Sequence, residues 1–286
     1  AHVSGVLSLP DAARLVCARG RLMQGCRSDG AMVSLEATEE EVRAMLADSP
    51  GVAIAGLNGP RQTVISGDEG AVVQIAADLA DQGRRTTRLE VSHAFHSPHM
   101  EEMLEAFKAE AATCTFHPPQ IPIISNLTGE RASDEQLMSP QYWTDLVRSA
   151  VRFSDGIKAL RAEGITTFLE CGPGGVLSAM GAGCVADEDA MTFIPSMRKG
   201  RDEITTLTTA LGDVHLAGHS VWWSAVLEGV LPHVVPLPTY AFQRERFWKD
   251  DTPQGSSANL GSVADVELWD AVKRGDAAEL AALLGV

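Results

Sequence analysis

The hydrophobic pattern of residues 32–91 predicts a small sheet covered by two helices. It runs as strand-like MVSLE, helical TEEEVRAMLAD with Thr38 at its N-cap, the strand pair GVAIAGLNG and RQTVISG, helical EGAVVQIAADLADQG ending at Gly83, and a last strand in RRTTRLEV. Elements in the order βαββαβ are typical of a ferredoxin-like unit. We therefore expect residues 32–91 to form a ferredoxin-like subdomain.

The pattern changes after residue 91, where short apolar runs alternate with amphipathic segments. The runs at 121–126 and 166–171 suit buried parallel strands. Helices are expected in MEEMLEAFKAEA, QYWTDLVRSA and SDGIKALRAEG, and the first residues also show helical spacing. This alternation predicts an α/β layer architecture. Residues 1–31 and 92–195 would form its parallel-sheet core, with residues 32–91 inserted into it.

Beyond residue 195 the sequence predicts connecting and helical segments. Residues 196–249 hold a helical stretch and then VVPLPTYAFQRERFW, whose prolines forbid a regular helix and whose aromatic residues can anchor it to another surface. Residues 250–286 begin with the composition of a flexible linker and continue as two short helices hinged at Gly275. We expect these parts to lie outside the α/β core.

Composition narrows the classes of partner. The 286 residues carry a formal net charge of −15 and a pI near 4.9, which disfavours nucleic acid and anionic membranes. No long apolar run occurs, and the first residues lack a signal-peptide pattern, so we expect a cytoplasmic protein. The five cysteines are odd in number and lack C-x-x-C spacing, which predicts reduced thiols.

The densest cluster of chemically active side chains is VSHAFHSPHM, where His93, His96 and His99 are spaced by three. Three imidazoles suggest a metal site, but Pro98 interrupts the helix that would align them and no H-E-x-x-H motif accompanies them. Two other interpretations are polar loop residues after a strand, and a general base on a loop of the kind where α/β folds place catalytic groups. We therefore predict no metal.

HAFHS, separated by two residues from a following methionine, resembles the His-Ala-Phe-His signature of malonyl-specific acyltransferase domains in modular type I polyketide synthases. These domains are related to malonyl-CoA:acyl carrier protein transacylases. Further segments occur in the order that this family uses, across residues 1–249: RLVCARGRLMQ, the N-x-P-x-Q pattern from Asn58 to Gln62, VISG, PIISNLTG, YWTDLVRSAVRF, LECGPGGVL and LPTYAFQRERFW. The resemblance implies a hydrolase-like parallel-sheet core whose N-terminal part is missing from these residues.

The resemblance assigns the reacting groups. The family's catalytic histidine falls on His96, which would take a proton from a serine hydroxyl and later return it. A backbone carbonyl near Leu146 would fix the tautomer of this imidazole. The family's carboxylate-binding arginine falls on Arg19, whose planar guanidinium suits the free carboxylate of a malonyl group. From helical spacing alone, Arg19 would be an exposed arginine.

The resemblance also assigns residues around the substrate. Phe95 falls where the family distinguishes extender units, since a bulky ring there disfavours methylmalonyl, whereas relatives that select methylmalonyl carry serine in a Tyr-Ala-Ser-His motif. His93 would help to shape the same pocket. Asn58 and Gln62 resemble residues near the active site, although Asn58 suits a hairpin-stabilising role equally well.

The family nucleophile is the serine of a G-H-S-x-G elbow, a sharp strand-to-helix turn. It lies a few residues before the position that corresponds to the first residue here, so we expect the isolated chain to be inactive. Gly218-His219-Ser220-Val221-Trp222 matches four of the five pattern residues. However, bulky Trp222 replaces the last glycine and the preceding segment is helical, which argues against Ser220 as the nucleophile.

The function implied by the resemblance is transfer of a malonyl unit from coenzyme A, through a serine ester, to the phosphopantetheine thiol of an acyl carrier protein. No cofactor is expected in the chain. Implied partners are malonyl-CoA, the carrier protein, neighbouring ketosynthase and ketoreductase domains, and a second synthase copy through a dimerisation element at residues 250–286. The alternatives are a non-catalytic scaffold that packs on a ketosynthase, and an esterase that uses Ser220.

Overall fold

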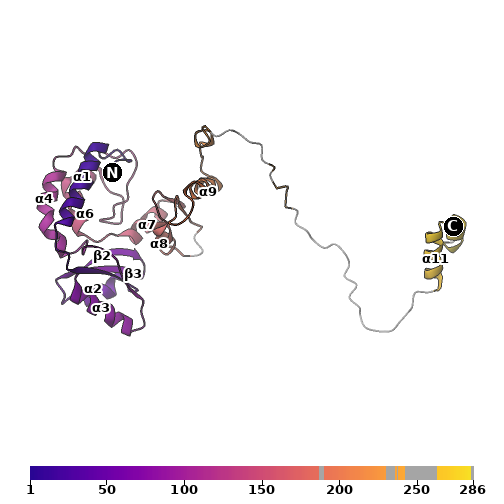
Figure 1. The fold of residues 1–286 in the computed structure, drawn as a ribbon, viewed down its shortest axis with the longest axis horizontal. Coiled ribbons are helices and arrows are strands. Elements are labelled where there is room, and N and C mark those ends of the chain that lie inside the picture. The colour runs from indigo at the N-terminus through magenta and orange to yellow at the C-terminus, as the bar shows by residue number, and fades with distance from the viewer. Residues whose placement is uncertain (187–189, 230–235, 237, 242–262, 285–286) are drawn as a thin grey trace. The chain divides into compact units, whose positions relative to one another are not determined.

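The computed structural model describes residues 1–186, 190–229, 236, 238–241 and 263–284 (Figure 1). Backbone contacts divide the chain into two compact units, residues 1–228 and residues 229–286. Most of VVPLPTYAFQRERFW and all of the predicted flexible stretch 250–262 lie outside the described residues. In the described part, no helix is long and apolar enough to cross a membrane.

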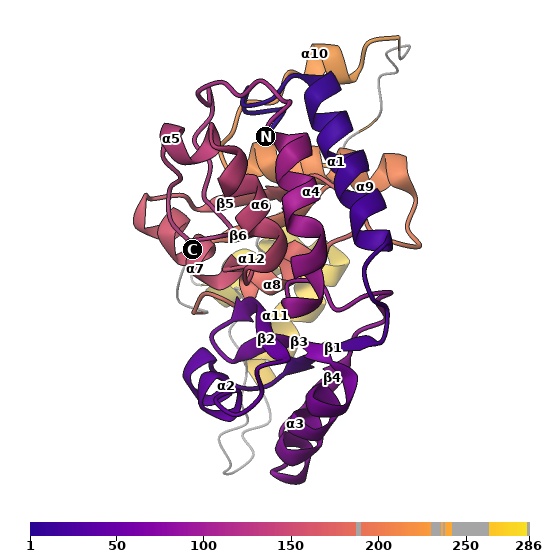
Figure 2. The same ribbon diagram turned by 90° about the vertical axis from the view of Figure 1, so that its left-hand side faces the viewer.

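Residues 30–88 form the predicted ferredoxin-like unit. Its elements are β1 (Gly30–Leu35), α2 (Glu39–Met45), β2 (Val52–Gly59), β3 (Gln62–Asp68), α3 (Glu69–Asp81) and β4 (Thr86–Arg88). The sheet order is β2-β3-β1-β4, and the neighbouring strands are antiparallel. Helices α2 and α3 cover one face of this sheet (Figures 1 and 2). The predicted order βαββαβ is therefore confirmed.

Local signals explain why these elements start where they do. Thr38 is the N-cap of α2, as predicted, and forms a capping box with Glu41. Arg84 also pairs with the Glu41 carboxylate. The hydrogen bonds from Arg84 and from the backbone of Thr38 lower the pKa of Glu41 to about 2. Beneath the helices, apolar residues of β1, β2 and β3 pack against those of α2 and α3, and the largest fully buried ones are Leu35, Val42, Ile65, Val72 and Leu79.

Helices on the other side of the sheet form a second packed layer. α1 (Leu9–Gln24) begins at the N-cap Ser8 and packs against α4 (Glu101–Ala111), which in turn packs against α6 (Pro140–Arg148). The short helices η1 (Pro98–Met100) and α5 (Asp134–Leu137) lead into α4 and α6, respectively. Its core includes Leu15, Met100, Phe107, Leu137 and Val147. The three predicted helical segments are thus present (α4, α6 and α7, below).

The parallel-sheet part consists of two strands in the described residues. β5 (Thr167–Glu170) pairs in parallel with β6 (Thr192–Pro195). α8 (Val176–Ala182) packs on both strands and α9 (Glu203–Leu216) on β6, while α7 (Phe153–Ala162) precedes β5 in the chain and contacts β2. The rings of Phe168 and Phe193 stack across the pair, with centroids 4.6 Å apart. The strand predicted at 166–171 is confirmed.

The strand predicted at residues 121–126 is wrong. This run folds back on itself: the backbone N–H of Ser125 donates to Glu130 O at 2.7 Å, and that of Ala132 donates to Ile123 O at 2.9 Å. Pro122 has no N–H to offer a sheet ladder, and Ile121 is 52% exposed. The backbone groups are therefore satisfied locally, and an apolar run alone did not distinguish this turn from a strand.

The remaining described helices follow in sequence order. α10 (Trp223–Val226) is a single turn after α9. In the second unit, α11 (Val263–Arg274) and α12 (Ala277–Leu284) pack against each other. Gly275 lies between them with φ of 68°, a conformation that glycine adopts without strain, as the predicted hinge requires.

Two close backbone approaches help to join the ferredoxin-like sheet to the rest of the first unit. The backbone of Val151 exchanges two hydrogen bonds with β2, donating to Ala55 O at 2.9 Å and accepting from Leu57 N at 2.8 Å. At the start of β1, a Cβ on Gly30 would lie 2.6 Å from Ala94 Cβ and 2.8 Å from His99 Cε1. Only glycine therefore lets the histidine segment approach this strand so closely.

Candidate functional site

The three predicted histidines lie on one loop but face different partners. His93 Nδ1 lies 2.9 Å from Ser92 Oγ, His96 Nδ1 lies 2.8 Å from the carbonyl oxygen of Ser149, and His99 Nε2 lies 2.8 Å from Asp68 Oδ1. The imidazoles therefore do not converge on a shared centre. The described residues contain no group of three or more His, Cys, Asp or Glu side chains that could hold a metal ion.

His96 has a defined tautomer and a strained backbone. A carbonyl oxygen only accepts hydrogen bonds, so Nδ1 of His96 carries the proton that it donates to Ser149, and Nε2 is left as the basic nitrogen. The backbone φ of His96 is 57°, the left-handed region that side chains other than glycine seldom occupy. This is the arrangement that a general base requires: one ring nitrogen held and the other free to accept a proton.

The surroundings of His96 lower its pKa. Burial contributes most, because it disfavours the charged imidazolium, and the positive charge of Arg19 acts in the same direction. Hydrogen bonds to the backbone carbonyls of Ser149 and Leu146 oppose the decrease. The net result is a lowered pKa, so the imidazole of His96 remains neutral, and able to accept a proton, at lower pH than an ordinary histidine.

The carbonyl that the resemblance placed near Leu146 corresponds to two acceptors, that of Ser149 and that of Leu146 itself. The 2.8 Å acceptor is Ser149 O, immediately after the end of α6, where the backbone turns from helical to extended (ψ 158°). The last carbonyls of a helix have no partner within it, so they and their neighbours are available to side chains. No side-chain signal marks this position, since every residue carries a carbonyl.

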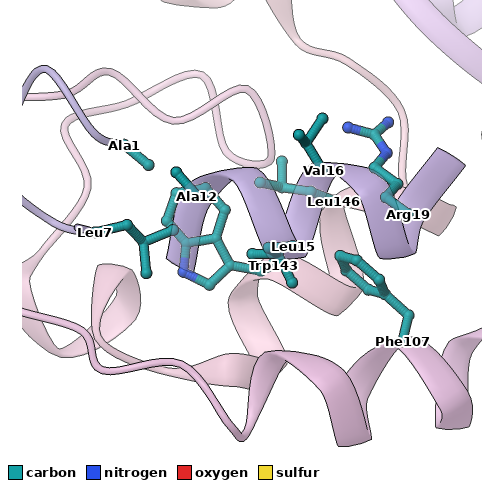
Figure 3. Close-up of a pocket in the computed structure, with 9 residues that line it drawn as sticks. All are labelled: Ala1, Leu7, Ala12, Leu15, Val16, Arg19, Phe107, Trp143 and Leu146. Carbon is teal, nitrogen blue, oxygen red and sulfur yellow. The ribbon is translucent and has the colours of Figure 1, made fainter. Parts of the chain in front are cut away.

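Arg19 lies on α1 at one end of an apolar pocket (Figure 3). The pocket has a volume of about 200 Å³, and its walls come from the N-terminal segment, α1, α4 and α6: Ala1, Leu7, Ala12, Leu15, Val16, Phe107, Trp143 and Leu146. Trp143 lies toward the other end (Figure 3). A cation at the edge of an apolar pocket can bind the acidic group of a small ligand whose remaining atoms contact the apolar walls.

The guanidinium of Arg19 has no counter-charge among the described residues. Its Nε is buried without a hydrogen-bond partner, and burial alone lowers its pKa. Arg21, two residues further along the same helix, is 71% exposed and pairs with Glu110 at 3.1 Å. In a protein with net charge −15, a partly buried arginine with no carboxylate partner in the described part of the chain has a guanidinium available to an anionic group.

Phe95 and His93 lie together beside His96. Their ring centroids are 5.9 Å apart at an angle of 43°. His93 is 3% exposed, while Phe95 is partly buried and contacts both the helical core and the small apolar cluster of Met32, Ala55 and Val64 on the sheet. Both rings are therefore fixed by packing, which is what a side chain that shapes a pocket requires.

Asn58 and Gln62 lie on the hairpin between β2 and β3. The backbone carbonyl of Asn58 accepts a hydrogen bond from Cys184 Sγ at 3.2 Å. Gln62 is exposed and lines a separate groove with Glu36, Arg61 and Arg85 among others. No hydrogen bond joins either side chain to His96 or Arg19 among the described residues, so their substrate-binding role stays a prediction.

Ser220 does not lie on a nucleophile elbow. It is exposed in the loop between α9 and α10, so a helix rather than a strand precedes it. Gly218 has φ of 92° and ends α9, and Trp222, at the last pattern position, is 77% exposed. The strained strand-to-helix turn that projects a reactive hydroxyl is absent at this described segment.

Residues 1–221 match the family model described as the acyl transferase domain. The chain belongs to this acyltransferase family. It is 45% identical over 284 residues to polyketide synthase GfsA of Streptomyces halstedii and 46% identical over 270 residues to the spectinabilin polyketide synthase system protein NorB of Streptomyces orinoci. The two matches cover 96% and 92% of this chain, but only 4% and 12% of those synthases.

Solved acyltransferase structures share the fold. The acyltransferase domain from the second module of the salinomycin polyketide synthase is 49% identical, with a TM-score of 0.75, over 85% of this chain and 57% of that one. FabD from Acinetobacter baumannii is 28% identical, with a TM-score of 0.66, over 76% of this chain and 68% of that one. The predicted α/β class and the resemblance to polyketide synthase acyltransferase domains are confirmed.

Proposed function

We propose that this acyltransferase belongs to the malonyl-specific type and moves a malonyl unit from coenzyme A to an acyl carrier protein. His96 is the general base and acid, Arg19 binds the malonyl carboxylate, and Phe95 with His93 restricts the space beside the substrate's second carbon. Asn58 and Gln62 are proposed to line the approach to this site. The observation that carries the proposal is an oriented imidazole with a lowered pKa that feels the charge of a guanidinium with no counter-ion among the described residues.

The proposed chemistry has two matched halves. In the first, Nε2 of His96 accepts the proton of a serine hydroxyl while the serine oxygen attacks the thioester carbonyl. The C–S bond then breaks, and the imidazolium returns the proton to the coenzyme A thiolate. In the second half, a phosphopantetheine thiol gives its proton to Nε2 and attacks the serine ester, and the serine oxygen recovers that proton. The acceptor serine is proposed to lie outside these 286 residues.

The proposed partners follow from that reaction. They are malonyl-CoA as donor, an acyl carrier protein as acceptor, and the ketosynthase and ketoreductase domains of a larger cytoplasmic synthase, with homodimerisation involving the terminal helices. No cofactor besides the coenzyme A and phosphopantetheine thioesters is needed, because the proton transfers and the nucleophile are supplied by side chains. The relatives' names support a multidomain synthase as the setting, since each is a polyketide synthase protein.

One prediction concerns extender-unit selection. In the full-length protein, Phe95→Ser together with His93→Tyr is expected to raise methylmalonyl use relative to malonyl, because removing the ring leaves room for one methyl group. One methyl is worth about 10- to 200-fold in discrimination. A competition assay with both thioesters measures the ratio. Ile157→Val, a buried substitution on α7 at a residue with no proposed part in the pocket, is the control; an unchanged ratio in the double variant would contradict the pocket assignment.

A second prediction separates transferase from esterase and scaffold. The 286-residue chain incubated with radiolabelled malonyl-CoA is expected to remain unlabelled, because Ser220 lacks the geometry of an elbow serine. The same assay on the full-length protein is expected to give a stable malonyl ester, which His96→Ala forms about 10²- to 10⁴-fold more slowly. Label on Ser220, or hydrolysis of p-nitrophenyl esters by the isolated chain, would favour the esterase. Binding to a ketosynthase, with no label in the full-length protein, would favour a scaffold.

A further inference from the structure

The loop that carries His96 is held from the side of the ferredoxin-like sheet. His99, three residues beyond His96, is 5% exposed, and its Nε2 lies 2.8 Å from the carboxylate of Asp68, the last residue of β3. His99 Nδ1 is buried and has no hydrogen-bond partner. The contact with Asp68 is therefore the only hydrogen bond of this ring in the described part of the chain. It joins two segments that are 31 residues apart.

The strain at His96 makes such support necessary. A non-glycine residue with φ of 57° persists only where its neighbours over-determine the backbone. Here, Ser97 Oγ donates to Ala94 O at 2.6 Å and accepts from the backbone N–H of His99 at 3.1 Å, which closes a tight turn directly around His96. Moving His99 would therefore move the donor that closes this turn. The bond to Asp68 fixes His99 in place.

The acceptor for His96 is held by the same sheet. Ser149 O accepts the hydrogen bond from Nδ1–H of His96, and two residues later Val151 makes its two backbone hydrogen bonds to β2. Arg152 continues this attachment by pairing with Glu39 at the start of α2. The imidazole and the carbonyl that orients it are thus both tied to the ferredoxin-like unit, one through β3 and the other through β2.

We propose that Asp68 and His99 are positioning residues for the acyl transfer, which hold the strained loop so that the imidazole of His96 keeps its Nδ1 on Ser149 and its Nε2 toward the substrate. The ferredoxin-like unit then serves as the template for the catalytic base. This inference rests on the proposed role of His96. It makes no demand on Arg19 or on the choice of extender unit.

The test compares variants of the full-length protein in malonyl transfer. Asp68→Ala and His99→Leu are each expected to lower kcat by about 10- to 100-fold, the size of effect that a small misplacement of a reacting group produces, with little change in KM. Asp68→Asn keeps an oxygen that can accept from His99 and is expected to restore most of kcat. The double variant Asp68→Ala/His99→Leu is expected to be no slower than the slower single variant, because both act through one contact.

Asp29→Ala is the matched control. This carboxylate pairs with Arg27 at 2.7 Å, and Arg27 in turn lies 3.5 Å from Asp68. Asp29 makes no hydrogen bond to His99, so kcat is expected to stay unchanged. Thermal unfolding of each variant identifies general loss of stability. The positioning role is overturned if folded Asp68→Ala keeps full kcat, or if Asp68→Asn is as slow as Asp68→Ala.

The two proposals fail in different ways. If His96→Ala abolishes transfer but Asp68→Ala and His99→Leu do not slow it, only the positioning role is lost. If His96→Ala itself transfers malonyl normally, the proposed function is overturned and the positioning role falls with it. The acid limb of the pH profile adds a readout that a merely structural contact would not move: in Asp68→Ala it is expected at higher pH, because a loosened loop exposes His96 to solvent.

Discussion

Replacing His96 with alanine is expected to lower kcat/KM for malonyl transfer in the full-length protein by about 10²- to 10⁴-fold, the usual contribution of a positioned general base. The physical reason is the geometry at this ring, where Nδ1 is committed to Ser149 and Nε2 is the available base. Measuring kcat/KM at saturating carrier protein gives the loss directly. His117→Ala, at an exposed histidine, is the control and is expected to leave the rate unchanged.

The assignment of His96 as the base also predicts the direction in which kcat/KM changes with pH. The base is active when neutral, so kcat/KM rises as pH increases through the pKa of His96. Because burial and the charge of Arg19 lower that pKa, the midpoint of the rise is expected below the ordinary value of about 6.5, so kcat/KM at pH 6.5 should already exceed half of its maximum. An acid limb centred well above 6.5 would contradict the assignment of His96 as the base.

Replacing Arg19 with glutamine is expected to lower kcat/KM for malonyl-CoA by about 10- to 150-fold while leaving acetyl-CoA nearly unaffected. A charge-assisted hydrogen bond contributes about 1.5–3 kcal/mol, and acetyl lacks the carboxylate that would use it. Since Arg19 has no counter-ion among the described residues, the substitution removes no ion pair from the fold. The ratio of the two thioesters is therefore the decisive measurement.

Arg21→Gln is the matched control for Arg19→Gln. Arg21 is on the same helix and carries the same charge, but it is exposed and pairs with Glu110, and exposed pairs of this kind contribute little. Its substitution is expected to change neither thioester rate. An equal loss for malonyl and acetyl in Arg19→Gln would show that the guanidinium acts on structure rather than on the carboxylate. A secondary consequence is a higher pKa for His96 in Arg19→Gln, since one positive neighbour is removed.

The sequence alone was sufficient for elements whose signals are local. The ferredoxin-like order followed from alternating periods, from the Thr38 N-cap and from turn residues, all of which act within a few positions of the element that they define. The helices α4, α6, α7 and α9 followed for the same reason, because an amphipathic stripe reports the burial of its own helix. The local histidine cluster indicated three candidates, and the motif resemblance selected His96 among them and pointed to Arg19.

The tertiary structure decided everything that depends on a partner distant in sequence. The run at 121–126 was misjudged because a short apolar segment satisfies either a strand or a tight turn, and only its hydrogen-bond partners at 130–132 separate the two. β6 was not predicted, since it becomes a strand by pairing with β5. No local pattern marks the carbonyl of Ser149 or the carboxylate of Asp68, and the resemblance implied only a carbonyl near Leu146. Backbone atoms carry no residue-type code, and a contact across 31 or 53 positions exists only once the chain has folded.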